Sequence, residues 1–469
     1  MSLFSALNTA ANSLNVIQAG IQVVSENMNN ATNADRTKHT VSQTTDPLSG
    51  VSISQYSRSV DAALQAQLHG TTSENGMQQV LSQYMGQIGN LLGSTLSNSA
   101  SDTATPKLTQ AFQDFTSSLQ ALSAAPENAV AQNQVVQKAQ ALVQTIHTLS
   151  AGVDQMATQA KSDITQTVTS INTDLTQIDQ FNATITALKS SNQPTADFED
   201  QRDATLRDLA SKINIRTTLR DDGSIAVFTP TGATLVDGTT TQLSYDKGVI
   251  SGAGGADITA AVSSGKLGGL LDLVADNSPA PASGDPTTEV FRKLKSQLNA
   301  IAGALTGSTQ AGQPTSITDA YNNAGPTNDG ELDTGLFTGG DAGTLAVNKS
   351  LLNGTKTIKQ SAVNAMVSAM TATGRTLTAD GLTLTNVSYG GMADQVGSNW
   401  STIQSNVNTQ ATTTSSFMNT LQTRYASSTG VNMDEEVANL QVLQRNYSAT
   451  ARVISVIGQM FDALSQAVT

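Results

Sequence analysis

Apolar residues recur at alternating steps of four and three along the first thirty residues of the chain. This spacing places a narrow apolar stripe on one side of an α-helix, as in the seam of a coiled coil. No charged residue occurs between residues 2 and 25. Because a helix exposed to solvent normally carries Lys and Glu beside its seam, we expect other chains to enclose this helix. The stripe consists of Leu3, Leu7, Ala10, Leu14, Ile17, Ile21, Val24 and Met28.

The other end of the chain has the same rhythm, with a single polar exception at Thr450. After Arg452 the only charged residue is Asp462. Asn432 is a good N-cap, and Glu435 three residues later would complete a capping box at the start of this helix. We expect the two terminal helices to pair with one another. The second stripe consists of Leu440, Leu443, Tyr447, Thr450, Ile454, Ile457, Phe461, Leu464 and Val468.

Apolar members of these stripes are the predicted assembly interface, and we predict no catalytic, cofactor-binding or metal-binding residue in this chain. The interface residues are Leu3, Leu7, Leu14, Ile17, Ile21, Val24, Leu440, Leu443, Tyr447, Ile454, Ile457, Phe461 and Leu464. An internal two-helix coiled coil within a monomer is the alternative, and the missing surface charge argues against it.

Between the two ends, helical and strand-like patterns alternate. Loop or short strands are expected up to about residue 56, and the Asp-Gly and Thr-Gly turns between apolar runs predict a small antiparallel β unit over residues 213–275. A Pro/Gly/Ser-rich linker at 278–286 and a loop-rich stretch at 307–345 follow. A second β-like segment covers residues 377–387. Helices are expected at 60–122 with a break at 94–101, from Pro126 with a long segment at 146–188, and at 196–212, 289–305, 358–370 and 396–428.

The expected fold class is mainly α with a β-rich insertion (α+β). Long N- and C-terminal helices pair as a coiled coil, a helical bundle forms the middle, and a small antiparallel β domain lies outermost. The predicted domains are residues 1–56 with 429–469 for the coiled coil, 57–193 with 357–428 for the bundle, and 194–356 for the outer β-containing domain.

Composition narrows the function classes. A net charge of −13 over 469 residues makes binding to nucleic acid or to an anionic membrane improbable. No run of 18 apolar residues occurs that would span a bilayer, and the N-terminus lacks the features of a cleavable signal peptide. The chain has no cysteine, which suits a protein that passes unfolded through a narrow channel and gains stability by oligomerising.

Candidate catalytic chemistry is sparse. The three histidines, His39, His69 and His147, lie in separate segments, so a zinc site is improbable. Gly265-Lys266 lacks the other residues of a phosphate loop and is interpreted as a flexible turn. Trp400 lies in a helical stripe and is expected in the core.

The densest group of carboxylates lies between residues 197 and 208, at the start of a predicted helix where acidic residues are favourable. Arg202 and Arg207 are spaced to pair with Glu199 and Asp203. Two carboxylates could also serve glycoside hydrolysis, so a cell-wall hydrolase stays open as an alternative.

Residues 2–33 resemble the N-terminal helix shared by bacterial flagellar axial proteins. The end of the chain resembles their C-terminal motif in residues 430–436, Asn439-Leu440, Tyr447, 451–453 and 461–464. The middle is similar to the hook-associated protein 1 family in residues 200–203 with Leu206 and Leu209, Asp222-Gly223, 235–238, 265–271, 336–339 and 346–348.

This resemblance implies a secreted structural protein of the extracellular bacterial flagellum, forming a ring at the hook–filament junction. The implied partners are further copies of the chain, the hook protein, the second junction protein and an export chaperone at the C-terminal helix, with export by the flagellar type III apparatus. One departure concerns residues 34–37, Ala-Asp-Arg-Thr, where the family commonly has a Pro-Gly-Tyr turn. The alternatives are another axial protein, a secreted helical adhesin or a cell-wall hydrolase.

A lone narrow stripe buries little apolar area to offset the entropy of ordering a helix. We therefore expect the terminal helices to be disordered in the free subunit and to fold on assembly.

Overall fold

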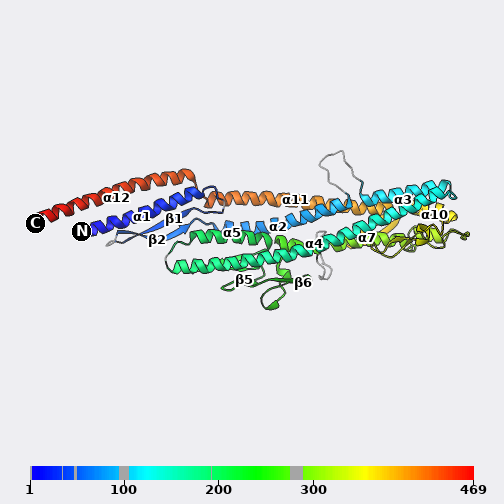
Figure 1. Ribbon diagram of the computed structural model, residues 1–469, viewed down its shortest axis with the longest axis horizontal. Coiled ribbons are helices and arrows are strands. Elements are labelled where there is room, and N and C mark those ends of the chain that lie inside the picture. Colours follow the sequence, from blue (N-terminus) through cyan, green and yellow to red (C-terminus); the bar gives the residue numbers. More distant parts are fainter. Residues whose placement is uncertain are drawn as a thin grey trace.

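The structure is a computed structural model that describes residues 3–33, 35–46, 50–93, 105–191, 193–274 and 289–468. Long helices run along one axis and give an elongated molecule, with the N- and C-terminal helices together at one end (Figure 1). Small antiparallel sheets are attached to this helical frame. The predicted fold class, mainly α with a β-rich insertion, is confirmed.

At the terminal end, α1 (Leu3–Asn30) packs against α12 (Met433–Val468). The loop after α1 leads into a hairpin of β1 (His39–Asp46) and β2 (Gly50–Arg58), which is antiparallel with a bulge at Ser42. The hairpin packs on α1. An isolated two-stranded hairpin is only marginally stable, so this contact with α1 is what supports it.

The body is a layered set of long helices: α2 (Ala62–Leu92), α3 (Lys107–Ala124), α4 (Ala129–Ser190), α5 (Ala196–Lys212) and α11 (Tyr389–Thr429). Helix α2 packs on α11 and on α5, and α4 packs on α3 and α5. Side-chain caps fix three of the starts: Asp61 accepts a hydrogen bond from Leu64 N–H, Asn128 accepts from Val130 and Ala131, and Ser388 accepts from Gly391 N–H. These helices agree with the helical segments expected from the sequence.

The predicted β unit is present, but it ends earlier than expected. Its strands are β3 (Arg216–Leu219), β4 (Ile225–Phe228) and β5 (Thr234–Val236) in one sheet, and β6 (Ser244–Asp246) with β7 (Val249–Ser251) in a hairpin. Two short 3₁₀ turns, η1 (Ala253–Gly255) and η2 (Thr259–Ala261), follow the hairpin.

Helix α6 (Gly265–Val274) replaces the end of the predicted β unit and the flexible turn expected at Gly265-Lys266, and both expectations are wrong there. The helix packs on α2 and α4. A Cβ at Gly269 would lie 2.6 Å from Val80 Cγ1, so glycine is required for this close approach. The glycines that make the segment look flexible are therefore packing positions, which a propensity argument cannot distinguish.

The second half of the insertion returns the chain to the body through α7 (Val290–Thr306), α8 (Ile317–Asn322), β8 (Phe337–Thr338), β9 (Ala346–Val347), α9 (Lys349–Leu352), η3 (Gln360–Ala362), α10 (Val363–Thr371), β10 (Arg375–Ala379) and β11 (Leu382–Val387). Helix α8 was not expected in the loop-rich stretch. The predicted linker at 278–286 and the break at 94–101 lie outside the described residues. Helices α5, α6 and α7 belong to the predicted outer domain, yet they pack on α4 of the predicted bundle domain. The domain boundaries stay a prediction.

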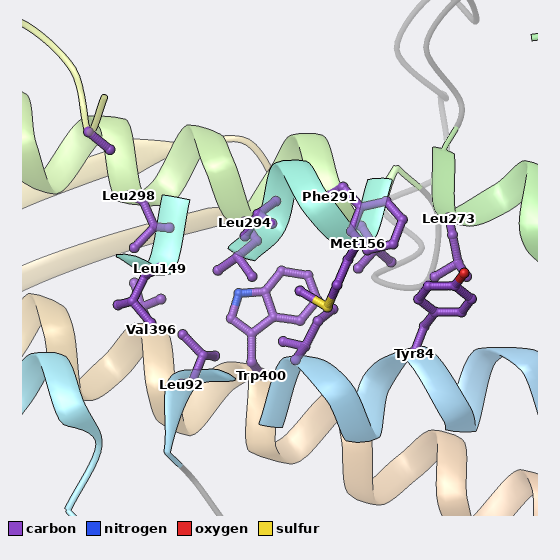
Figure 2. Packing of buried hydrophobic residues seen from close by; sticks show 14 of the residues in the cluster. Tyr84, Leu92, Leu149, Met156, Leu273, Phe291, Leu294, Leu298, Val396 and Trp400 are labelled. Carbon is purple, nitrogen blue, oxygen red and sulfur yellow. The ribbon is translucent and has the colours of Figure 1, made fainter. Parts of the chain in front are cut away.

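Trp400 on α11 is at the centre of the core, as expected from its helical stripe (Figure 2). It is 2% exposed, and its indole N–H donates to Gln297 Oε1 at 2.8 Å. Side chains from α2, α4 and α7 surround it in Figure 2, including Leu92, Leu149 and Leu294. One continuous cluster of buried apolar residues runs through the helical body, while the terminal pair lies outside that cluster.

Candidate assembly interface

Helices α1 and α12 approach closely along the predicted stripes. Gly20 lies against Leu443, where an added Cβ would come within 3.3 Å of the leucine methyl groups. Near the free end of the pair, the rings of Phe4 and Phe461 meet edge to face with centroids 6.5 Å apart. The terminal helices therefore pair within this single chain.

The predicted interface residues fall into three groups by burial. Val24 and Ile457 are buried, and Tyr447 and Leu464 are exposed. The half-buried majority is Leu3, Leu7, Leu14, Ile17, Ile21, Leu440, Leu443, Ile454 and Phe461. Pairing within one chain thus covers these stripes only partly, and whether neighbouring copies cover the remainder stays a prediction. The side chain of Val468 lies outside the described set.

A second apolar stripe on α12 was missed by the sequence argument. Val442, Val453, Val456 and Met460 are each between 50% and 52% exposed. Each of them directly precedes a residue of the predicted α12 stripe, so together they form a neighbouring face of the same helix. Further heptad-spaced apolar residues mark this face in the sequence, but the expectation of one seam per helix leaves them out.

The other side of α1 contacts the hairpin, and this accounts for the burial of Val16 and Val23, which lie outside the predicted stripe. At its end, Asn27 exchanges two hydrogen bonds with the backbone of His39, at 2.9 and 3.0 Å. Its amide also donates to Glu436 Oε2 at 3.1 Å. Asn27 therefore ties α1, the hairpin and α12 together.

We call the contacts among residues 35–39, Arg58, the first turns of α5 and the start of α12 the joint. Lys38 Nζ lies 2.6 Å from Glu435 Oε1 and 3.4 Å from Glu436 Oε1. The backbone N–H of Lys38 donates to Thr429 O at the end of α11. Lys38 therefore connects the loop after α1 to both C-terminal helices.

Asp200 accepts most of the hydrogen bonds on the α5 side of the joint. It receives the backbone N–H and the hydroxyl of Thr37, at 3.1 and 2.8 Å, and lies 2.9 Å from His39 Nε2. Arg58 donates to Glu199, Asp200 and Asp203, at 2.7, 3.0 and 2.6 Å. One guanidinium thus holds three carboxylates of α5 against the end of β2.

The charges of the joint are tuned by these partners. Burial alone would raise the pKa of Asp200, but the hydrogen bonds from His39 and Thr37 and the charge of Arg58 outweigh it and lower that pKa. Burial would lower the pKa of Arg58, but the charges of Asp203, Glu199 and Asp200 raise it instead. Both shifts favour the charged forms, so Asp200 and Arg58 stay ionised at neutral pH.

The local ion pairs expected within α5 are wrong. Arg202 instead donates to Asn182 Oδ1 and Gly223 O, at 3.0 and 2.7 Å, and Arg207 binds Asp35. The carboxylates considered for hydrolysis, Glu199 and Asp203, bind Arg58. They serve the joint as anchors for a cation.

Residues 35–37, where the family pattern has a different turn, also contact α5. Asp35 binds Arg207, Arg36 binds Asp197, and Thr37 binds Asp200. The expected N-cap is present, because Asn432 Oδ1 accepts from the N–H groups of Asp434 and Glu435. The Glu435 side chain binds Lys38 rather than closing the capping box.

Within the described ranges, no group of three or more His, Asp or Glu side chains is placed to hold a metal ion. No helix in the same part of the chain is both long and apolar enough to cross a membrane.

Two family models match the sequence. The model described as the flagellar hook-associated protein FlgK helical domain matches residues 93–327, half of the chain. The C-terminal model of the flagellar basal body rod FlgEFG proteins matches residues 422–467, which include α12.

Several characterised proteins are similar over nearly their full length. Flagellar hook-associated protein 1 of Salmonella typhimurium is 24% identical, with 98% of this chain and 99% of that protein covered. The same values for the Escherichia coli protein are 24%, 98% and 99%, and for the Bacillus subtilis protein 23%, 98% and 97%. The solved flagellar hook junction protein FlgK of Burkholderia pseudomallei matches with a TM-score of 0.46 and 21% identity, over 58% of this chain and 46% of that one.

Proposed function

This chain belongs to the flagellar hook-associated protein FlgK family, and from that premise we propose that it is a structural adaptor forming a ring at the hook–filament junction. The family is one of structural flagellar proteins that form part of the external flagellum. The match to the rod-protein C-terminus covers a region common to axial proteins, whereas the match over residues 93–327 separates this chain from hook and rod proteins.

The observation that carries the proposal is the half-covered apolar surface of the terminal pair. The paired stripes stay partly accessible, and Val442, Val453, Val456 and Met460 form a second exposed face on α12. Covering an apolar side chain that is half exposed contributes on the order of 1 kcal/mol. A contact repeated around a ring adds many such increments, so these faces favour packing between copies.

The arrangement of the molecule supports a different position in the assembly for each of its parts. The terminal pair, residues 1–56 with 429–469, would line the inside of the tubular assembly. The joint would hold the pair at a fixed angle to the helical body, and the β-containing segment would face outward. The hook protein, the second junction protein and further copies of this chain are the partners in this arrangement.

Two features of the chain fit the export that the proposal requires. The chain has no cysteine that could cross-link in a narrow channel. The apolar face of α12 would need covering before assembly, and an export chaperone bound to that helix would provide the cover.

The test is complementation of cells that lack this gene. We expect cells without the gene to carry hooks but to shed filament subunits into the medium, and the intact gene to restore attached filaments. Val456→Asp should fail to restore them, because it places a charge in the α12 face. Val130→Asp, at a residue that is 76% exposed on α4, is the matched control and should restore them. Attached filaments in cells without the gene would refute the junction role.

A further inference from the structure

Helix α11 carries an exposed face without charge. No charged residue occurs from Gln395 to Thr423, although the whole chain has a net charge of −13. One side of this stretch is buried, with Trp400, Ile403 and Val407 in the core, and Phe417 near its end is 48% exposed. Aromatic residues such as Phe are enriched, and charged residues depleted, at the centre of protein–protein interfaces.

The exposed hydroxyl groups along this uncharged stretch of α11 can be buried without losing a hydrogen bond. Each donates its proton to the backbone carbonyl four residues earlier, so covering it leaves no unsatisfied donor. The exposed hydroxyls bonded in this way are those of Thr402, Thr409, Thr412, Thr413, Ser416, Thr420 and Thr423.

A second surface of hydroxyl and amide side chains lies on α4. Thr165, Thr169, Thr173 and Thr176 are exposed, and their hydroxyls are bonded to the backbone in the same way. Of these, Thr169, Thr173 and Thr176 border a shallow hollow of about 560 Å³ that has no charged residue in its lining. The hollow is lined by Thr169, Asn172, Thr173, Thr176, Gln177, Gln180 and Gln242.

The two surfaces lie on different sides of the body. Helix α2 separates them, because it packs on α11 and also on α5 and α6, which pack on α4. Figure 1 shows α11 and α4 on opposite edges of this layer in the half nearer the termini. Each copy therefore has two distinct neutral surfaces that face away from one another.

The two surfaces also lie at the same level along the molecule. Helix α2 runs antiparallel to both neighbours. Its contacts move back along α2 from Gly89 to Ser82 as they move forward along α11 from Gln404 to Asn408. They move back from Leu91 to Tyr84 as they move forward along α4 from Gly152 to Asp163. Ser82 donates to Asn408 on α11 at 2.7 Å, and two residues further along α2, Tyr84 donates to Asp163 on α4 at 2.8 Å. Nine residues on from Asn408 is Phe417, and nine on from Asp163 is Asn172, an advance of about 14 Å along each helix.

We propose that the Phe417 face of α11 packs into the α4 hollow of the next copy around the ring. This inference rests on the proposed function and names the lateral contact that the ring uses outside its terminal helices. A second copy is the occupant for two reasons. A closed ring of more than two copies needs two different, complementary surfaces on each copy. A net negative chain repels its own copies over charged surface, so neutral faces at equal height are where copies approach at least cost.

Cysteine cross-linking tests the contact, because the natural chain has no cysteine. We expect the double variant Thr173→Cys with Thr420→Cys, assembled on cells and oxidised, to give a ladder of covalent multimers. Each single variant should give none, since the two positions meet only between different faces. A ladder that is absent from assembled flagella overturns the proposal, as do dimers formed by Thr420→Cys alone.

Two further readouts separate this inference from the junction role. Adding Phe417→Ser to the double variant should lower the yield of multimers about tenfold through the lost apolar burial. Adding Val130→Ser instead is the matched control and should not change the yield, and an unchanged yield with Phe417→Ser contradicts the proposal. Filament attachment is scored in the same cells. Attached filaments without the ladder would contradict the lateral contact but not the junction role.

Discussion

Arg58 ends β2 and donates hydrogen bonds to three carboxylates of α5, all within 3.0 Å. Asp200 and Asp203 are 2% and 3% exposed. Removing the guanidinium would leave the Asp203 carboxylate in the interior without its cation, whereas Asp200 would keep its contacts with Thr37 and His39. Within the joint, the buried charge of Asp203 therefore depends on Arg58.

Replacing Arg58 by Met should lower the free energy of unfolding by about 3 kcal/mol, the cost of leaving a buried charge without its partner. Denaturant unfolding at pH 7 measures it. The matched control is Arg424→Met, at an exposed position on α11, which should change stability by less than about 0.5 kcal/mol. A loss of stability with Arg58→Met no larger than that with Arg424→Met would contradict the stabilising role of Arg58.

His69 on α2 gives the molecule a second charge-dependent feature. Burial lowers its pKa to about 4, with the nearby charge of Asp203 opposing the shift and that of Arg207 adding to it. Because the pKa in the folded state lies below the unfolded value of about 6.5, the unfolded chain binds the proton first as the pH falls. This contribution to stability is complete above pH 6.5 and is lost progressively toward pH 4.

Lowering the pH from 7.5 to 4.5 should reduce the free energy of unfolding by about 2.5 kcal/mol through protonation of His69 in the unfolded chain. In the variant His69→Asn this part of the pH dependence should disappear, as measured by denaturant unfolding at the two pH values. The same dependence in both proteins would mean that His69 does not titrate as described.

Contacts in the joint mark the limit of residue-level prediction. The spacing within α5 suggested that Arg202 and Arg207 pair locally, whereas they bind Asn182 and Asp35. Arg58 lies more than 140 residues before its partners in the sequence. A local spacing rule cannot identify such partners, because they depend on how the hairpin is placed against α5.

At the scale of elements, the periodic patterns predicted most helices well. Helix α5 has the predicted bounds, Ala196–Lys212, and the interruption at Gly430 separates α11 from α12 as expected. Two features were not predicted, and each has its own physical reason. Helix α6 depends on glycines that allow close packing, and the second face of α12 falls outside the rule of one apolar seam per helix.

Gly20 tests the pairing of α1 with α12. Gly20→Val should push the helices apart, because even a Cβ would meet Leu443 at 3.3 Å, and it should reduce filament attachment in the complementation assay. Gly70→Val on α2 is the matched control, because an added Cβ there meets no atom within 4 Å. Attachment that tolerates both substitutions equally would contradict the close approach of the two terminal helices.

At the scale of the whole molecule, the sequence indicated that the chain leaves and returns along paired helices, and the structure has this arrangement (Figure 1). The order of the layers was not predictable, because many helices with one apolar face can pack in several orders. The same limit applies to the domain boundaries. The helical body has a continuous apolar core, and the terminal pair projects from it with much of its apolar surface uncovered.

We expect the terminal pair to reach its full stability only among neighbouring copies. Amide hydrogen exchange on the purified free subunit tests this most directly, because it reports local stability element by element. We predict little protection in α1 and α12 beside strong protection in α2 and α4. Protection of α1 and α12 equal to that of α4 in the free subunit would contradict the account.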